Sequence, residues 1–357
     1  MKTIKEIGDI RNKKFLLRTD LDVPVMNGQI TETFRIEKQK ETIDYIIRNG
    51  GKIVMVAHIS DIDSFGPILE QLEKIINYKI EFVKDLSGVV QFCKDSQLSI
   101  CLLDNIRKFS GEKENDDVFA KELATGFDYY VNNDFAVSHR NQASVVAITK
   151  YLPSFAGLQL VTEIASLTHA IDAPRLGKII VMGGAKTETK IPVIKAFLTK
   201  ADKILIGGVI ANDFLKARGL EIGLSKADAN PTKLFAGIEL DNESLISPID
   251  FVINDQKILD IGPKTVEEFV KIIKNAKMVI WNGPMGLFED DRFETGTRII
   301  AEAVAAASES IVGGGDTISA IGKFELSGKY TFVSTGGGAM LEFLSGNVLP
   351  GIYALNR

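Results

Sequence analysis

Short apolar runs rich in β-branched residues alternate with stretches of helical spacing along almost the whole chain. The apolar runs cover residues 15–23, 52–58, 99–107, 129–137, 178–184, 203–208, 250–254, 278–283, 310–315 and 330–337. Helical spacing lies between them at residues 119–125, 190–201 and 265–276. Continuous apolar runs separated by helices are typical of parallel strands buried on both faces. The pattern therefore predicts an α/β fold of doubly wound parallel sheets, with ligands beyond the carboxyl ends of the strands.

The length and composition predict two soluble domains. A chain of 357 residues is too long for one ordinary domain, and 45% hydrophobic with 25% charged residues is typical of soluble proteins. A formal net charge of −5 argues against general binding to nucleic acid or to anionic membranes. No apolar run approaches the ~20 residues that span a bilayer, and the N-terminus has no apolar signal core.

The cysteines and the partner classes complete this expectation. Cys93 and Cys101 are the only cysteines, and their spacing fits neither a disulfide framework nor a metal site. They are interpreted as small buried apolar residues. We therefore expect a protein of the reducing cytoplasm that binds small molecules, without a nucleic-acid or membrane partner. A monomer is expected as well, although no residue pattern indicates the oligomeric state.

The glycines divide the chain into two unlike halves. Nine of the 31 glycines precede residue 174 and 22 follow it. The predicted strands of the first half end instead in polar residues, among them Asp20, Asp22, His58 and Arg107. One half thus offers side chains to a ligand and the other offers backbone. The boundary is expected near Gly157, with a connecting helix at residues 161–173 that serves as a hinge.

Four glycine-rich segments of the second half each follow a predicted strand. They are GGAKTETK (183–190), GG (207–208), GGGDT (313–317) and GGGA (336–339). Glycines let the backbone approach a ligand, and a helix N-terminus supplies free N–H groups for phosphate. Lys186 and Lys190 would add positive charge, and Asp316 would hold a divalent cation. A single Gly-Gly pair is more often a tight turn, so it is the set of four that favours a polyphosphate site.

Other residues extend the two expected sites. The loop WNGPMGLFE (281–289) contains Glu289, which either accepts bonds from ribose hydroxyls or starts a helix. In the first half, Arg35, Arg107 and Arg140 lie at strand ends or at a helix start and suit phosphate or carboxylate recognition, with salt bridges as the alternative. No Ser-His-Asp order, paired-carboxylate motif or His/Cys cluster is present. Phosphoryl transfer, which depends on positioning and charge neutralisation, fits this inventory.

These segments, in this order, resemble phosphoglycerate kinase over essentially the whole chain. The most specific matches are GGAK (183–186), WNGPMG (281–286), GGGDT (313–317) and STGGGA (334–339). Weaker support comes from RTDLDVP (18–24) and DNIR (104–107). The resemblance implies two α/β domains across a cleft and reversible phosphoryl transfer between MgATP and the carboxylate of 3-phosphoglycerate, a step of glycolysis and gluconeogenesis that gives ADP and 1,3-bisphosphoglycerate.

The resemblance also implies roles for individual residues. Lys186 would neutralise the transferring phosphoryl group, and Arg35 would orient the acceptor carboxylate and share that charge. The acceptor-binding positions are Asp20, Asp22, Arg35, His58, Arg107 and Arg140. The nucleotide-binding positions are Gly184, Lys186, Lys190, Gly208, Asn282, Glu289, Gly314, Gly315, Asp316, Thr317 and Gly337, with Asp316 as the metal ligand.

The domain boundaries follow from the same resemblance. It implies an acceptor domain at 1–160, the connecting helix at 161–173 and a nucleotide-binding domain at 174–335. The tail at 336–357 would first complete the nucleotide site with its glycines and then return to the N-terminal domain.

Departures from the family pattern concentrate in the acceptor half. Where the family usually reads His-Leu-Gly-Arg-Pro, residues 58–62 read HISDI, so Asp61 replaces a phosphate-binding arginine. Asp22 replaces an acceptor-site asparagine, and Gln142 replaces a histidine. Asn133-Asp134 disturbs the Asn-Asp pair that the family has at this place, and Thr189 replaces an aspartate. The chain is also shorter than most members of the family.

The acidic replacements lead to an expectation about affinity. A charge about 4 Å away changes binding by roughly 1–4 kcal/mol, so weaker 3-phosphoglycerate binding is expected unless a cation such as Lys108 compensates. The alternatives are a kinase of another carboxylate and a non-catalytic nucleotide-binding relative that has lost its acceptor site. A Rossmann dehydrogenase is disfavoured because no G-x-G-x-x-G opens the first βαβ unit.

Overall fold

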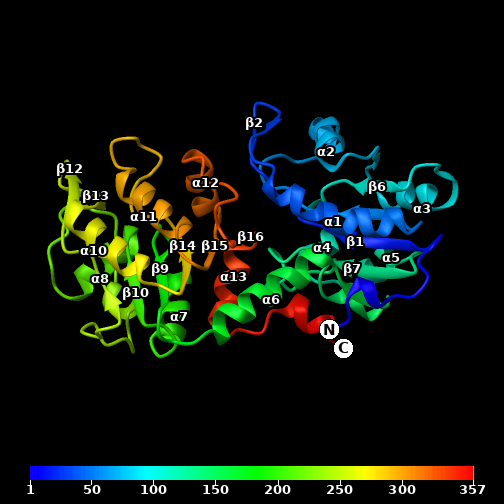
Figure 1. The fold of residues 1–357 in the computed structure, drawn as a ribbon. Helices are drawn as coiled ribbons and strands as arrows, with labels where there is room; N and C mark the ends of the chain where they lie inside the picture. The colour runs from blue at the N-terminus through cyan, green and yellow to red at the C-terminus, as the bar shows by residue number, and fades with distance from the viewer. Residues whose placement is uncertain (357) are drawn as a thin grey trace. The chain divides into compact units, whose positions relative to one another are not determined.

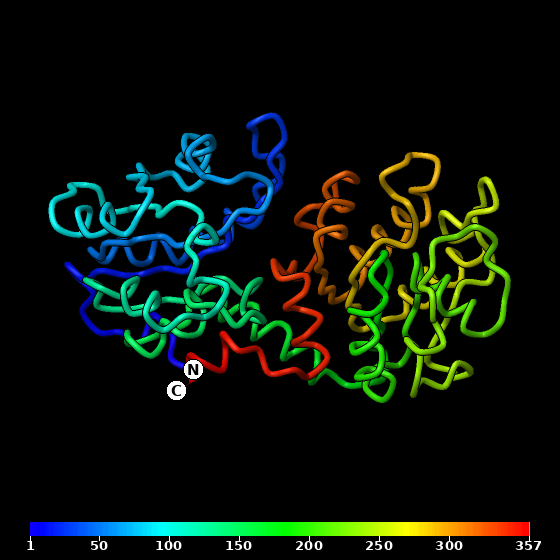
Figure 2. Tube along the Cα trace, turned by 180° about the vertical axis from the view of Figure 1, so that it is seen from behind, coloured from blue at the N-terminus to red at the C-terminus, as the bar shows by residue number. Residues whose placement is uncertain are grey.

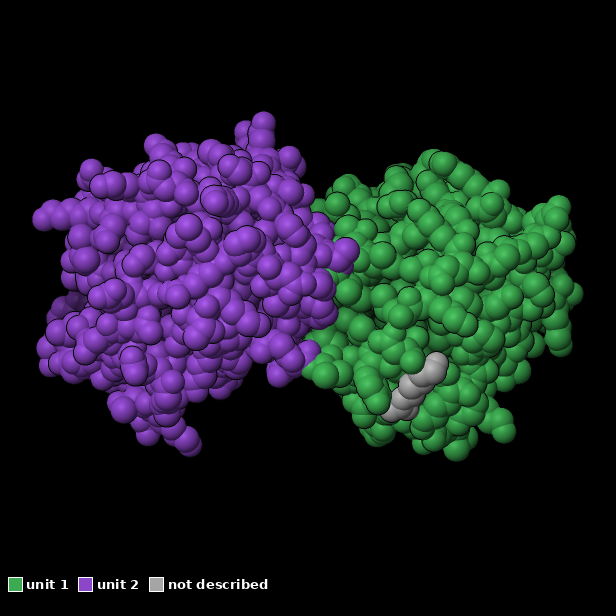
Figure 3. Space-filling model, turned by 60° about the horizontal axis from the view of Figure 1, so that its bottom comes forward, with its two compact units in different colours: residues 1–164, 348–357 green, residues 165–347 purple. Residues whose placement is uncertain are grey.

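The computed structural model describes residues 1–356 and contains two compact units. Unit 1 contains residues 1–164 together with the segment that starts at Val348, and unit 2 contains residues 165–347 (Figure 3). The division falls inside α6 (Leu158–Asp172), the helix that occupies most of the region predicted as the connector. No helix among the described residues is long and apolar enough to cross a membrane.

Unit 1 contains a six-stranded sheet in which every strand pairing is parallel (Figure 1). Its strand order is β5 (Glu81–Val83), β6 (Ile100–Leu103), β4 (Lys52–Val56), β1 (Lys14–Arg18), β7 (Tyr129–Asn132) and β8 (Ser154–Ala156). The chain turns from one half of this sheet to the other between β1 and β7. Asp20 and Asp22 follow β1, and Asn133 and Asp134 follow β7, so polar residues collect at that switch point.

Helices and a hairpin complete unit 1. The helices are α1 (Phe34–Arg48), α2 (Leu69–Ile76), α3 (Leu86–Asp95), α4 (Ser110–Lys113), α5 (Asp117–Leu123) and α14 (Pro350–Ala354), with short 3₁₀ turns at Ile4–Glu6, Gly66–Ile68, Ile106–Lys108 and Ala147–Lys150. The two-stranded hairpin is β2 (Val25–Met26) with β3 (Gln29–Ile30). The apolar side chains of β1, β4 and β6 pack with α1 and α2 into one buried core, which holds the switch point rigidly.

Unit 2 contains a second six-stranded parallel sheet. Its order is β11 (Leu245–Ile246), β10 (Lys203–Ile206), β9 (Lys178–Met182), β14 (Met278–Asn282), β15 (Ser310–Gly313) and β16 (Phe332–Ser334). Counted within the unit, this is the order 3-2-1-4-5-6 of a doubly wound nucleotide-binding sheet, with its switch point between β9 and β14. The α/β class and the doubly wound parallel sheets predicted from the sequence are thus confirmed.

The helices of unit 2 follow its strands. They are α7 (Thr187–Phe197), α8 (Gly208–Ala217), α9 (Pro231–Leu234), α10 (Pro263–Lys274), α11 (Thr295–Ala305), α12 (Gly315–Lys323) and α13 (Gly337–Leu344). Three of them, α8, α12 and α13, begin at glycines of the four glycine-rich segments. The core contains Trp281 of β14, Phe269 of α10 and Ile300 of α11, which are all fully buried.

The structure corrects one predicted strand. Residues 250–254 were expected in a parallel sheet, but β12 (Phe251–Asn254) pairs antiparallel with β13 (Lys257–Ile261) in a separate hairpin. Asp255 and Gln256 form its two-residue turn, with φ angles of 48° and 62°. Such left-handed pairs twist a turn to match the flanking strands, so the local chemistry favours the hairpin.

Two further details of the strands differ from the expectation. The other apolar runs contain strands that end one to five residues earlier, because the polar or glycine residues at the ends of the runs lie in loops. The sequence analysis missed the short strands β5, β8 and β11. Each has only two or three residues, which is too short to be recognised as an apolar run.

The C-terminal segment belongs to the first unit. Helix α14 lies within unit 1, and the Gly351 N–H donates to the Ser138 carbonyl at 2.8 Å. A Cβ at Gly351 would meet the Val145 side chain at 2.7 Å, so this glycine allows close packing. In Figure 2 the red end of the trace runs to the unit that contains the blue N-terminal residues.

Candidate active site

Three loops of unit 2 are bonded to one another at the switch point of its sheet. The Gly184 N–H donates to the Pro284 carbonyl at 2.7 Å, and the Gly208 N–H donates to the Met285 carbonyl at 2.8 Å. The Val209 N–H donates to the Gly184 carbonyl at 3.0 Å. The loops after β9, β10 and β14 therefore form a single glycine-lined frame, held before any ligand arrives.

Gly208 shows why this frame requires glycine. Its φ of +56° is rare for other residues, and a Cβ would lie 2.7 Å from the Gly184 nitrogen and 3.1 Å from the Pro284 oxygen. Any side chain would separate two of the three loops. Replacing Gly208 with valine is therefore expected to raise the KM for ATP at least tenfold, a loss of about 1.4 kcal/mol, as measured by steady-state kinetics at saturating acceptor. Gly219, which also has a positive φ but open space around it, is the matched control position.

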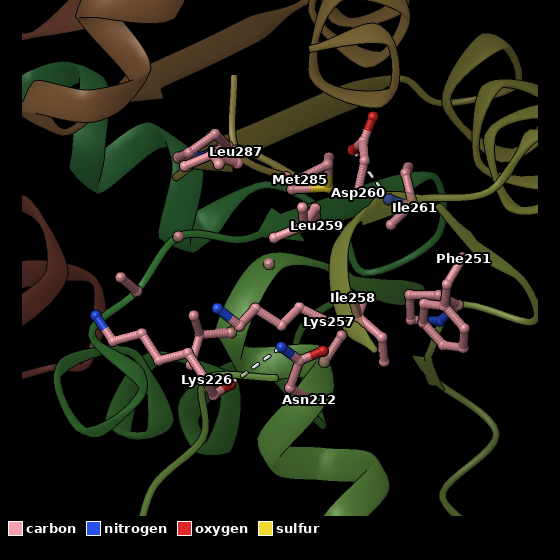
Figure 4. A pocket seen from close by; sticks show the side chains of 18 of the residues that line it. Asn212, Lys226, Phe251, Lys257, Ile258, Leu259, Asp260, Ile261, Met285 and Leu287 are labelled. Atoms are coloured by element: carbon pink, nitrogen blue, oxygen red, sulfur yellow. Dashed lines mark hydrogen bonds between the residues drawn. The ribbon is translucent and has the colours of Figure 1, made fainter. Parts of the chain in front are cut away.

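A cavity of about 290 Å³ opens beside the frame (Figure 4). Its apolar lining includes Val209, Pro248, Phe251, Ile258, Leu259, Ile261, Met285 and Leu287. Its polar lining includes Asn212, Lys226, Lys257, Asp260, Glu289 and Asp316. A concave, mostly apolar cavity with a few polar groups suits a flat heterocycle, and the adjoining glycine frame suits phosphates.

Two lysines lie near the start of α7, next to the glycine frame. Lys190 is buried and Lys186 is exposed, both near the start of α7. Burial lowers the pKa of Lys190, with Asp316 opposing and Lys186 adding to that effect. A desolvated ammonium group binds an anion strongly because little water must be displaced.

Asn282 and Thr317 hold the neighbouring backbone of the frame in place. The Asn282 side-chain amide donates to the Gly313 carbonyl at 2.7 Å, and the Gly283 N–H donates to the Thr317 hydroxyl at 2.7 Å. Gly314 adopts a φ of +103° directly before α12. A Cβ on Gly337, the first residue of α13, would lie 3.1 Å from the Gly314 Cα, so the starts of α12 and α13 are close.

The structure brings the predicted nucleotide residues of unit 2 into one region. Gly184, Gly208, Glu289 and Asp316 line the cavity directly. Asn282, Gly314, Thr317 and Gly337 form its supporting loops, and Gly315 opens α12.

Several lining residues were missed from the sequence. The β12–β13 hairpin contributes Phe251, Ile258 and Asp260, although it carries no glycine motif. Asp260 is buried, accepts the Gly296 N–H at 2.6 Å, and has its pKa raised by burial to about 6. In the sequence, the only sign that Asp260 lines the cavity is an acidic residue within the short apolar stretch KILDI (257–261). That sign is weak without knowledge of the fold.

A buried ion pair lies under the polar residues of unit 1. The Arg18 guanidinium contacts the Asp134 carboxylate at 2.8 Å, and both side chains are at most 1% exposed. Arg18 also approaches the His58 Nδ1 atom at 3.2 Å. Arginine only donates, so Nδ1 is an acceptor and the proton of neutral His58 is on Nε2. Burial lowers the pKa of His58, which agrees with a neutral ring.

The two aspartates of the β1 loop differ in protonation. Burial, followed by the neighbouring Asp134 carboxylate, raises the pKa of Asp20 to about 8. Burial would also raise the pKa of Asp22, but hydrogen bonds from His58 and Ser60 outweigh it and lower that pKa well below its ordinary value. At neutral pH, Asp22 is therefore an anion and Asp20 is mostly a neutral acid.

Arg35 faces both aspartates from the first turn of α1. Its Nε atom is 3.9 Å from the Asp20 Oδ2 atom, and its Nη1 atom donates to the Asp22 carbonyl at 3.0 Å. Burial opposes its charge, but the surrounding carboxylates raise its pKa overall. Arg35 is thus a fixed cation beside a buried carboxyl oxygen that accepts no hydrogen bond from any of residues 1–356.

The remaining acceptor residues lie at the ends of β4, β6 and β7. The His58 Nε2 atom contacts the Asp22 carboxylate at 3.2 Å. Arg107 has a pKa lowered by burial and then by the nearby Arg140 charge, which identifies the two as neighbouring cations. The structure therefore brings Asp20, Asp22, Arg35 and His58 together by direct contacts, with Arg107 and Arg140 beside them.

Two charged residues near this cluster turn away from it. Asp61 accepts the Val25 N–H at 3.1 Å and so ties its loop to the β2–β3 hairpin. Lys108 contacts the Asp104 carboxylate at 2.8 Å, so its charge is engaged by that carboxylate. The structure thus gives no support to Lys108 as the compensating cation.

Comparison with known proteins identifies the family. The sequence profile of phosphoglycerate kinase matches residues 4–347. The chain belongs to the phosphoglycerate kinase family. A phosphoglycerate kinase of Francisella philomiragia is 37% identical, with 99% of this chain and 98% of that protein covered. One from Borrelia garinii is 35% identical with 100% of both chains covered.

Solved structures agree with this membership. The phosphoglycerate kinase of Coxiella burnetii superimposes with a TM-score of 0.83 at 33% identity, covering 99% of this chain and 98% of that one. That of Pyrococcus horikoshii gives a TM-score of 0.89 at 29% identity, covering 100% and 98%. The protein is thus an enzyme that transfers a phosphoryl group to a carboxylate, as the sequence resemblance predicted, and the alternative functions are not favoured.

Proposed function

We propose that unit 2 binds ATP or ADP with Mg²⁺ and that unit 1 binds 3-phosphoglycerate. The observation that carries the nucleotide assignment is the glycine frame at the switch point of unit 2, which joins an apolar cavity to Lys190 and the start of α12. The acceptor assignment is supported by Arg35, Arg107 and Arg140 around the second switch point.

The reaction in this proposal is an in-line phosphoryl transfer. An oxygen of the acceptor carboxylate attacks the terminal phosphorus of ATP, and the bond from that phosphorus to the bridging oxygen of ADP breaks. Arg35 orients the carboxylate and offsets its charge, and Lys186 neutralises the moving phosphoryl group. These are the two catalytic residues. Asp22 and His58 act by shaping the acceptor pocket.

Asp316 is the proposed metal-binding residue. It is exposed, lines the cavity, and lies close enough to affect the Lys190 charge. Among residues 1–356 there is no cluster of three acidic, histidine or cysteine side chains suited to a metal. One carboxylate together with nucleotide phosphates is the usual coordination of Mg²⁺ in kinases, so the residues fit this ion. Mg²⁺ would neutralise charge on the phosphate oxygens.

We infer that the units approach each other when both substrates are bound. The proposed acceptor and nucleotide residues belong to different units, and transfer requires their ligands to meet. Helix α6, in which the division between units falls, is the proposed hinge. Small-angle scattering should show a smaller radius of gyration with both ligands than with either alone. Identical curves would contradict closure.

The central experiment measures ATP consumption with a panel of phosphorylated and unphosphorylated acids. Turnover with 3-phosphoglycerate, dependent on Mg²⁺, is the expected result. ATP binding without turnover on any acid would overturn the proposal. We also propose that the protein is a monomer and that it is located in the cytoplasm. In the same preparation, light scattering should give the mass of a monomer.

Acceptor affinity is expected to increase when the family residue is restored at position 61. Asp61→Arg removes a negative charge and returns the arginine, so KM for 3-phosphoglycerate should fall roughly tenfold, the factor given by about 1.4 kcal/mol. Because Asp61 also accepts the Val25 N–H, Asp61→Asn is the control that separates charge from loop geometry. A KM that is unchanged in Asp61→Arg would show that Asp61 does not limit binding.

Acceptor binding is also expected to weaken above pH 8. The pKa of Asp20 is raised to about 8, so this carboxyl is neutral at pH 7 and ionises as the pH rises through 8. The new charge lies beside Arg35 and repels an anionic acceptor, so KM should rise roughly tenfold by pH 9. In Asp20→Asn the KM should stay level over this range. A level profile in the unmodified enzyme would contradict the assignment.

A further inference from the structure

Ser60 joins two charged residues of the acceptor site. Its hydroxyl accepts a hydrogen bond from the Arg107 Nη1 atom at 3.1 Å. Its backbone N–H donates to the Asp22 Oδ1 atom at 2.8 Å. The other oxygen of the same carboxylate contacts the His58 Nε2 atom. Asp22 therefore fixes the loop that carries Ser60, and Ser60 in turn contacts the guanidinium group of Arg107.

The contact leaves one edge of Arg107 for a ligand. Its Nη2 atom is buried and, within residues 1–356, has no hydrogen-bond partner. The neighbouring Arg140 adds a second positive charge. A guanidinium group that is held at Nη1 and whose Nη2 donors are unused is suited to recognition of a phosphate. Its orientation then depends on what holds Nη1.

His58 is already committed to the same arrangement. Its Nδ1 atom faces Arg18, and its Nε2 proton is directed to Asp22. The neutral ring therefore has its only donor engaged within the protein. Two family features are altered here, since Asp61 replaces the phosphate-binding arginine and Ser60 replaces the glycine before it. Arg107 and Arg140 are therefore the arginines left to bind the phosphate group of the acceptor.

We propose that Ser60 is a positioning residue that, anchored by Asp22, orients Arg107 toward the phosphate group of the acceptor. This inference rests on the proposed function of unit 1. In this chain the serine replaces a glycine that has no hydroxyl, so the contact is an addition to the family pattern. It offsets part of the loss of the arginine at position 61 by fixing the remaining cation in advance of binding.

The test is a kinetic comparison of three variants at position 60. Ser60→Ala keeps the backbone N–H and removes the hydroxyl, so KM for 3-phosphoglycerate should rise roughly 10- to 100-fold, the usual worth of one hydrogen bond to a charged group. The kcat and the KM for ATP should not change. Ser60→Thr keeps a hydroxyl and should restore the original KM. Ser60→Gly, the family residue, should behave like Ser60→Ala.

A double-mutant cycle with Arg107→Ala links the effect to its target. Once Arg107 is removed, Ser60→Ala should have no further effect on KM, because the two residues act as one unit. Ser87, an exposed serine at the start of α3, is the matched control, and Ser87→Ala should leave KM unchanged. Independent, additive effects of Ser60→Ala and Arg107→Ala would overturn the proposal.

The outcomes separate this proposal from the function on which it rests. If the unmodified enzyme does not turn over 3-phosphoglycerate, the proposed function fails. If it does, and Arg107→Ala raises KM while Ser60→Ala does not, only the positioning role fails. A change in melting temperature without a change in KM would reduce Ser60 to a structural residue and would also overturn the proposal.

Discussion

Replacing Lys186 with alanine is expected to lower kcat by about 100-fold or more, the usual scale for losing one charge that contacts the transition state. Lys186 directly precedes α7, at the end of the loop that follows β9, and its side chain is exposed. An exposed lysine contributes little to folding, so the loss should appear in the chemical step. The buried Lys190 remains to bind the nucleotide, and KM for ATP should change much less than kcat.

The measurement is steady-state kinetics with both substrates saturating. Lys195 provides the control, because it is an exposed lysine near the C-terminal end of α7, the helix that Lys186 precedes. Lys195→Ala should retain the kcat of the unmodified enzyme. Lys186→Arg should recover part of the activity, since the charge returns with a different shape. An unchanged kcat in Lys186→Ala would refute the catalytic assignment.

Asp134→Ala is expected to destabilise unit 1 by about 3–5 kcal/mol, because it leaves a buried guanidinium without its counter-ion. Arg18 and Asp134 are in contact at 2.8 Å and are almost completely excluded from solvent. Arg18 also reaches the Thr19 carbonyl and the Ser144 hydroxyl, but these neutral partners do not balance its charge. The loss should be visible as unfolding of unit 1 at lower urea concentration.

Two probes can distinguish the units in this experiment. Trp281 is the only tryptophan and is buried in unit 2, so its fluorescence follows unit 2, while circular dichroism follows both. The circular dichroism transition should begin earlier in Asp134→Ala. Lys150→Ala, which breaks a half-exposed pair with Asp117, should cost less than about 1 kcal/mol. Equal effects of the two substitutions would contradict the prediction.

Most residues of the proposed nucleotide site could be predicted because they lie in short contiguous sequence motifs. Glycines are required where a Cβ would collide with a neighbouring loop, as at Gly208, and such requirements are visible in the sequence. Phe251 and Ile258 could not be found in this way. They reach the cavity through an antiparallel hairpin, and apolar side chains carry no sign of which cavity they line.

The acceptor half was less predictable because its properties depend on contacts between distant segments. The sequence shows acids at positions 22 and 61 but not where they point. Asp61 bonds to a backbone amide, whereas Asp22 organises His58 and Ser60. The opposite protonation of Asp20 and Asp22, two residues apart, likewise follows from burial and hydrogen bonding that only the fold supplies.

The return of the segment from Val348 to unit 1 has a consequence for biosynthesis. Unit 2 is a continuous stretch, residues 165–347, so its synthesis is complete before residues 348–356 of unit 1 are made. Unit 1 lacks helix α14, with the Gly351 contact to Ser138, until that moment. We therefore expect a free chain truncated after residue 347 to bind ATP while its N-terminal portion remains protease-sensitive. Adding a peptide of residues 348–356 should then restore its resistance.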